Sequence, residues 1–260
     1  MTALVDSIHT WLESLDPALL YWVGGSILVY ALATNLAWRL RSRISSRPAL
    51  RDTLVQVARF LFCLGIPYLA LGGWPRPPFH GLLSLEDLGL VGANPRWPAT
   101  RWLGAAGTGI WIGLAAFFLL LLAWRSANRG TVRLSLPPRP WWAVLIEGFY
   151  LQVHWAFYRA ALAVALGDPS LGAFGGLGLI YLEWALDPAW RQGWREQAQA
   201  AERWLRAALA LVAAILFFLT HNLWICLGLY WVLGIALRGV ARSGDRPRPE
   251  LPESSQLSGS

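Results

Sequence analysis

The stretch WLGAAGTGIWIGLAAFFLLLLAW, residues 102–124, contains no charged side chain. A helix needs about 20 consecutive, mainly apolar residues to cross the hydrocarbon core of a bilayer, so this stretch predicts a transmembrane helix. The whole chain fits the same class. Its 260 residues are 56% hydrophobic and only 14% charged, whereas about a quarter of the residues in soluble domains are charged.

Six further apolar segments surround this one, and we expect each to form a helix. They are residues 18–38, 54–73, 141–166, 171–186, 205–219 and 223–238. Residues 205–238 are too many for one ordinary span, so we place a break at Thr220-His221-Asn222, where short polar residues favour a turn. The glycines of segment 171–186 suit close helix packing. The sequence therefore predicts an all-α, polytopic transmembrane helix bundle of about seven spans.

The basic residues are all arginines, and their placement predicts the orientation of the bundle. Arginines are concentrated in four regions that a seven-span arrangement puts on one side of the membrane, whereas the other side has only Arg76, Arg96 and Arg101. The four regions are 39–53, 125–140, 187–206 and the tail from residue 238. Because cytoplasmic loops carry an excess of lysine and arginine, we expect the N-terminus outside and the C-terminus in the cytoplasm.

The net charge of +7 is therefore interpreted as a topology signal. We expect the protein to lie in the lipid bilayer of the plasma membrane. Other membrane proteins are candidate partners, and we expect no binding to nucleic acid. Residues 239–260 include the Pro- and Ser-rich sequence SGDRPRPELPESSQLSGS, which is typical of a disordered cytoplasmic tail. The two cysteines, Cys63 and Cys226, lie in apolar segments and are expected to be core residues rather than a disulfide.

Polar side chains inside the apolar segments are the candidates for a functional site, because ionisable residues are costly there. The stretch VHWAFYRAAL, residues 153–162, contains His154 and Arg159. With His154, Glu147 and Glu183 would supply the roughly three ligands that a hydrolytic metal site needs. Glu147 and His154 lie about 10 Å apart along one helix, however, which exceeds the i, i+4 spacing of ordinary helical ligand pairs.

Each candidate also has a structural interpretation. His154 would be an ordinary core histidine if its neutral imidazole were bonded to a neighbouring helix, and at mid-depth it could instead ligate chlorophyll or haem. Glu147 and Glu183 would be protonated or paired near the cytoplasmic face. Arg159 would extend outward towards Asp168 or towards helix-end carbonyl groups.

Three stretches, in chain order, resemble the CAAX-processing and bacteriocin-processing (CPBP) family of intramembrane metalloproteases. They are LEDLGLVGANPRWPATRWLGAAGTGIWIGL (85–114), VHWAFYRAAL (153–162) and THNLWICLGLYWVLG (220–234). The first is similar to the family's Leu-Gly-Leu, basic turn and Gly-rich helix. The second takes the place of its Glu-Glu-x-x-x-Arg helix, and the third is similar to its Thr-Gly-Ser-Leu-Trp turn followed by His-x-x-x-Asn. The resemblance implies a CPBP-like membrane core at 85–238, after a two-span extension at 1–84 and before the tail at 239–260.

The resemblance does not extend to most of the family's catalytic positions. The paired glutamates of the family fall on His154 and Trp155, whereas its arginine is retained as Arg159. Its last histidine falls on Tyr230 and its asparagine on Gly234. The family's Phe-x-x-x-His motif should lie in the fifth segment, where IYLEW (180–184) has no histidine.

We therefore expect a catalytically degenerate CPBP-like homologue that acts as a binding, assembly or complex subunit rather than as an enzyme, with no cofactor. Its candidate cavity is formed by His154, Trp155, Arg159 and Tyr230. Two alternatives stay open. One is an active metal-dependent intramembrane endopeptidase with a rearranged zinc site at Glu147, His154 and Glu183. The other is a membrane subunit that binds a pigment or another cofactor.

Overall fold

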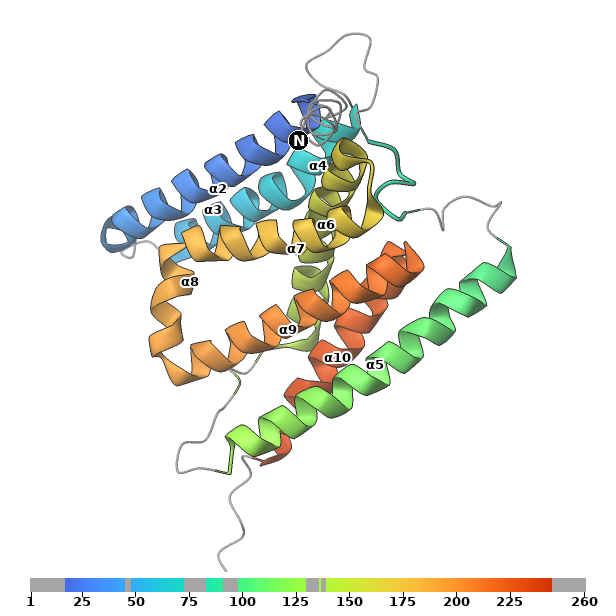
Figure 1. Cartoon of the computed structure of the whole chain (residues 1–260). Coiled ribbons are helices and arrows are strands. Elements are labelled where there is room, and N and C mark those ends of the chain that lie inside the picture. The colour runs from blue at the N-terminus through green and yellow to red at the C-terminus, as the bar shows by residue number, and fades with distance from the viewer. Residues whose placement is uncertain are drawn as a thin grey trace, which may run out of the picture.

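A computed structural model describes residues 17–44, 48–72, 83–90, 98–129, 136 and 139–244. In this part of the chain every regular element is a helix (Figure 1). The helices are α2 (Pro17–Ile44), α3 (Pro48–Phe60), the π-helix η1 (Leu61–Gly65), α4 (Ile66–Gly72), α5 (Ala99–Ala127), α6 (Trp141–Leu166), α7 (Pro169–Leu186), α8 (Pro188–Gln192), the 3-10 helix η3 (Gly193–Arg195), α9 (Gln197–Thr220) and α10 (Leu223–Gly244).

Each of the seven apolar segments coincides with a helix, and the second of them is built from α3, η1 and α4 in succession. Five helical stretches are long and apolar enough to cross a membrane. They are Ala18–Arg41, Thr53–Gly72, Ala99–Ala127, Gln199–Thr220 and Leu223–Arg242. α6 and α7 are not among these five, and they are the helices that carry His154, Arg159 and Glu183.

The predicted break between the last two helices is confirmed. α9 ends at Thr220, and His221 adopts the left-handed conformation, with φ 47°. The Asn222 side chain then accepts hydrogen bonds from the backbone N–H groups of Trp224 (2.9 Å) and Ile225 (3.2 Å), so it caps the start of α10. The short polar residues therefore both end one helix and begin the next.

The predicted start of the C-terminal tail is wrong. α10 continues to Gly244, so residues 239–244 are helical. The helix extends because its buried face continues: Ala241 follows Leu237 by one turn, and both are buried. The remaining tail, residues 245–260, lies outside the described residues, as do residues 1–16 and the two arginines Arg76 and Arg96.

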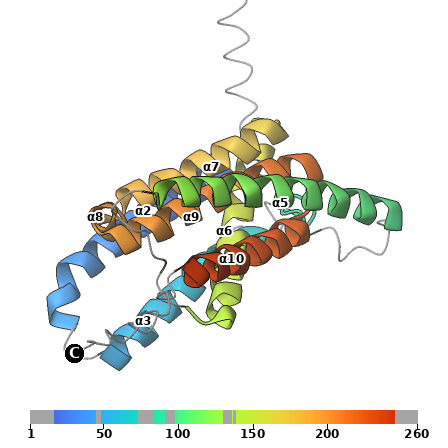
Figure 2. The same cartoon turned by 90° about the horizontal axis from the view of Figure 1, so that it is seen from below.

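The helices form two layers, which Figures 1 and 2 show from two directions. One layer contains α2, α7, α9 and α5 in that order, and the other contains α3 with η1 and α4, then α6 and α10. α6 packs against α7 more extensively than any other two elements pack. It also contacts α2, η1 and α10, so most of its length is buried.

Two glycines of α7 allow this close approach to α6. A Cβ atom at Gly172 would lie 2.7 Å from the Arg159 carbonyl oxygen, and one at Gly176 would lie 2.9 Å from the Arg159 backbone nitrogen. No side chain larger than hydrogen fits at these distances. The prediction that the glycines of this segment serve helix packing is confirmed for these two.

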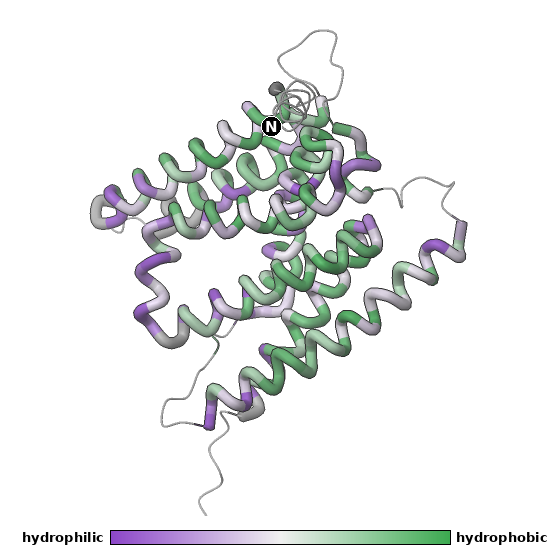
Figure 3. Tube along the Cα trace, viewed as in Figure 1, coloured by the Kyte–Doolittle hydropathy of each residue, from purple (hydrophilic) through white to green (hydrophobic). Residues whose placement is uncertain are grey.

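Apolar side chains cover much of the outer surface of the bundle. Leu32 of α2 is 62% exposed, and Trp111 and Phe118 of α5 are 75% and 57% exposed. Figure 3 shows hydrophobic residues along most of the helix lengths, whereas hydrophilic residues gather at helix ends and around α8. This distribution is the one expected of helices that face lipid.

Candidate functional site

A buried chain of polar side chains connects α6, α7 and α2. His154 and Tyr158 are one turn apart on α6, so they lie on the same face of the helix. The His154 imidazole Nε2 lies 3.2 Å from Oε1 and 3.1 Å from Oε2 of Glu183, which belongs to α7. The Tyr158 hydroxyl donates a hydrogen bond to Glu183 Oε1 and lies 2.9 Å from the Ser26 hydroxyl of α2.

This polar chain is closed off from solvent. His154 and Glu183 are each 2% exposed, and Tyr158 is 0% exposed. The Phe62 ring of η1 lies 4.6 Å from the His154 ring, centroid to centroid, and covers it. Burying polar groups is costly unless they bond to one another. The mutual pairing of the imidazole, the phenol and the carboxylate therefore explains how the core tolerates them.

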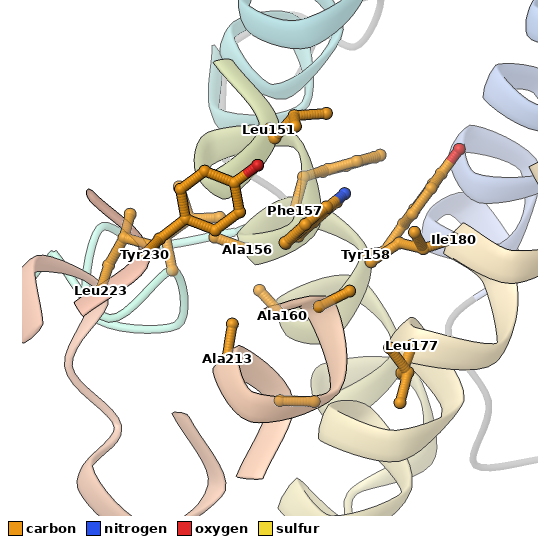
Figure 4. Close-up of a cluster of buried hydrophobic side chains, with 14 of the residues drawn as sticks. Leu151, Ala156, Phe157, Tyr158, Ala160, Leu177, Ile180, Ala213, Leu223 and Tyr230 are labelled. Carbon is orange, nitrogen blue, oxygen red and sulfur yellow. The ribbon is translucent and has the colours of Figure 1, made fainter. Parts of the chain in front are cut away.

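The four residues of the predicted cavity are all buried, but they do not converge on one point. Trp155 is 1% exposed, and its ring packs edge-on against Tyr230 of α10, with centroids 5.9 Å apart. Its other neighbour is Trp184 of α7, at 6.0 Å. Figure 4 shows Tyr230 and Tyr158 on opposite sides of α6. Trp155 of α6 and Tyr230 of α10 therefore form an aromatic contact between these two helices, whereas His154 belongs to the polar chain with Glu183.

Arg159 does not extend outward as expected. Its side chain is 2% exposed, its Nε donates to the Trp155 carbonyl (3.1 Å), and its Nη1 donates to the Ala213 carbonyl of α9 (3.1 Å). The guanidinium carbon also lies 4.4 Å from the centroid of the Phe217 ring. Asp168 is not its partner, because that carboxylate caps α7. The carbonyl groups accept hydrogen bonds from the guanidinium inside the bundle.

Glu147 lies in a separate cluster with arginines. Its carboxylate binds the side chains of Arg139 and Arg206, and Arg59 of α3 lies 3.5 Å away. Arg139 also lies 3.9 Å from Glu202 of α9. The cluster therefore joins α3, α6 and α9 to the segment before α6, and the expected pairing of Glu147 is present.

The three residues of the alternative zinc site are thus divided between two clusters. His154 and Glu183 are bonded to each other, whereas Glu147 is bonded to arginines. Among the described residues, no group of three or more His, Cys, Asp or Glu side chains is close enough to hold a metal ion. His154 and Glu183 supply two of the roughly three protein ligands of a catalytic zinc, so these side chains do not assemble the donor set for that metal.

Sequence reasoning missed two residues of the polar chain, Tyr158 and Ser26, and the Phe62 ring that covers it. Tyr158 follows His154 by four residues, and this spacing could have identified it as a neighbour on the same helix face. Ser26 and Phe62 come from the N-terminal helices, where no local pattern distinguishes them. Only the packing of α2 and η1 onto α6 brings them to His154 and Tyr158.

Comparisons of the chain with protein-family models, with curated proteins and with solved structures give no match. The site is therefore interpreted from its own geometry. A carboxylate, an imidazole and a phenol are hydrogen-bonded inside a helix bundle. Such a group links α6 and α7 to α2 through polar bonds that are specific in direction.

Proposed function

We propose that the protein is a multi-pass integral membrane protein of the plasma membrane, and that it acts as a binding, assembly or complex subunit. In this proposal its core is a catalytically degenerate, CPBP-like bundle. The closed polar chain of His154, Tyr158 and Glu183 supports this function best. A hydrolytic centre needs a position open to water and substrate. These three side chains are at most 2% exposed and are bonded to one another, which suits a role in holding helices together.

We also propose that seven helices span the membrane. They are α6, α7 and the five stretches that are long and apolar enough to cross a membrane by themselves. His154, Tyr158 and Glu183 are hydrogen-bonded to one another's side chains within the bundle, which lowers the cost of placing α6 and α7 at membrane depth. The arginine pattern then puts the N-terminus outside and the Glu147 cluster near the cytoplasmic face.

Cysteine accessibility tests this topology. Ser42→Cys and Ser126→Cys are labelled with a membrane-impermeant maleimide in intact and in permeabilised cells. Cys63 and Cys226 are buried, so they give little background. We expect labelling of both introduced cysteines only after permeabilisation. Labelling of both from outside intact cells would overturn the orientation.

Affinity purification of the full chain in mild detergent tests the function. We expect at least one other membrane protein to co-purify at a constant molar ratio to the chain across independent preparations, and the same preparations to leave membrane-embedded peptide substrates uncleaved. A single monodisperse chain that hydrolyses such peptides would contradict the proposal and favour the endopeptidase alternative.

A further inference from the structure

The connection between α6 and α7 and the connection between α9 and α10 lie at one end of the bundle (Figure 1). A pocket with several charged side chains in its wall lies there, away from the His154–Glu183 chain. Its volume is about 310 Å³, which falls at the small end of ligand pockets, about 300–1,000 Å³. The charged and titratable side chains in its wall are Glu86, Asp87, Arg101, Arg159 and His221. They come from four different parts of the chain.

Arg159 is the deepest charge of this wall. It is 2% exposed, and it donates hydrogen bonds to the Trp155 and Ala213 carbonyls and to the Gln152 side-chain oxygen, all of them neutral. Among the described residues no carboxylate forms an ion pair with it. A buried cation is costly without a counter-ion. An anionic group in the adjoining pocket would supply that counter-charge.

The wall also carries negative charge, which restricts the kind of anion. Asp87 is held in place because its Oδ2 accepts hydrogen bonds from the Ser84 backbone N–H and the Ser84 hydroxyl, both at 2.7 Å. Glu86 precedes it on the same exposed turn. A simple anion would meet repulsion from these two carboxylates, whereas a ligand that also carries a cation would be attracted to them.

The turn that carries the two carboxylates is fixed to the α9–α10 connection. The Leu223 backbone N–H donates to the Gly89 carbonyl (2.9 Å). Gly89 has φ +72°, and a Cβ atom there would lie 2.6 Å from the Phe217 ring and 3.0 Å from the His221 carbonyl oxygen. Only glycine permits both this conformation and this approach. The two signs of charge are therefore held around the pocket by the fold itself.

We propose that this pocket binds a small zwitterion, with a phosphate or carboxylate directed to Arg159 and Arg101 and an ammonium group directed to Glu86 and Asp87. The headgroup of an aminophospholipid and a free amino-containing phosphate or carboxylate share this chemistry. Binding of such a ligand depends on the charges and contacts of the pocket wall, and on neither the proposed subunit role nor the proposed orientation.

Binding is measured on the detergent-purified full chain with phosphoethanolamine, and with inorganic phosphate and ethanolamine as separate half-probes. We expect phosphoethanolamine to bind more tightly than either half-probe. Arg101→Gln and Glu86→Gln at the mouth should each weaken it about tenfold or more, because each removes a charged partner. Arg191→Gln, an exposed arginine of α8, is the matched control and should leave binding unchanged.

Arg159→Gln should abolish binding, but Arg159 also holds α6 to α9, so the mouth variants decide the outcome if this variant does not fold. Native mass spectrometry separates the two sources. Retained phosphatidylethanolamine that is lost in Arg101→Gln identifies a lipid headgroup, whereas binding of the soluble probe without retained lipid identifies a free ligand. The proposal is overturned if neither form of binding is seen, or if Arg101→Gln and Glu86→Gln behave like Arg191→Gln.

Discussion

The imidazole Nε2 of His154 lies 3.1 Å from Oε2 of Glu183, and each side chain is 2% exposed. The same carboxylate accepts a hydrogen bond from the Tyr158 hydroxyl. One carboxylate of α7 therefore joins two side chains of α6. Removing Glu183 takes the hydrogen-bond partner from the His154 imidazole Nε2 and one of two partners from the Tyr158 hydroxyl, which keeps Ser26. Removing His154 leaves the bond between Tyr158 and Glu183 in place.

We expect Glu183→Ala to lower the free energy of unfolding more than His154→Ala. The bond lost with His154 is worth on the order of 1 kcal/mol in a membrane bundle. Glu183→Ala leaves the buried His154 Nε2 unpaired, at a cost of about 1–3 kcal/mol, and also removes the bond to Tyr158. Unfolding in detergent measures both variants, with Leu182→Ala as a control because this neighbour is 44% exposed. An equal effect of the two variants, or the opposite order, would contradict the shared-carboxylate account.

The glycines of α7 allow a matched comparison of helix packing. A Cβ atom at Gly176 would lie 2.8–2.9 Å from Arg159 atoms, whereas one at Gly178 would meet no atom within 4 Å. We expect Gly176→Ala to destabilise the fold by about 1–3 kcal/mol through overpacking. Gly178→Ala should be neutral or slightly stabilising, because alanine favours helix. Thermal melts of the two variants test this difference, and equal melting temperatures would contradict the close approach of α6 and α7.

The arginine cluster around Glu147 predicts a large effect from a small change. Glu147→Gln keeps the size of the side chain but removes the negative charge that Arg139 and Arg206 contact. Because the arginines stay partly buried, we expect a loss of about 3–5 kcal/mol of unfolding free energy. Glu196→Gln is the control, since Glu196 is exposed. Similar stabilities of the two variants would show that the cluster contributes little.

The Asp168 carboxylate caps α7 and gives a prediction on pH. It accepts hydrogen bonds from the backbone N–H groups of Leu171 (3.2 Å) and Ser170 (2.6 Å), which lower the pKa of Asp168 below its usual value. A lowered pKa in the folded state stabilises the fold above the unfolded-state pKa, about 3.9. That stabilisation is lost as the pH falls through the folded-state pKa.

Asp168→Ala should therefore melt at a lower temperature than the wild type at pH 7. The difference in melting temperature should shrink as the pH falls from the unfolded-state pKa, about 3.9, through the folded-state pKa. Asp168→Asn retains a cap that cannot ionise, so it separates the loss of charge from the loss of hydrogen bonds. A difference between wild type and Asp168→Ala that stays constant down to pH 3 would exclude the ionised carboxylate as its cause.

The helices could be predicted from the sequence because apolar run length and turn residues are local properties. Segment 141–166 coincides with α6, and the break at His221 falls where Thr220, His221 and Asn222 predict it. The end of α10 could not be placed as well. Leu237 and Ala241 continue a buried face into a stretch whose composition resembles a tail.

The pairing of polar residues could not be predicted, because it depends on how each helix is rotated and tilted against its neighbour. The sequence groups Glu147 and Glu183 near the cytoplasmic face, in one alternative zinc site. The packing of α6 on α7 instead brings Glu183 to His154, and it turns Glu147 towards arginines from three other segments. The partner of Arg159 could not be predicted either, because the Ala213 carbonyl is 54 residues away in sequence.

Metal analysis beside thermal melts tests the central claim, that His154 belongs to a closed structural chain rather than to a hydrolytic metal centre. The wild type, His154→Ala and Glu147→Ala are purified in detergent under the same conditions. We predict a wild type without stoichiometric zinc, and two variants that melt at lower temperature. Stoichiometric zinc in the wild type that is lost in either variant at an unchanged melting temperature would contradict the account.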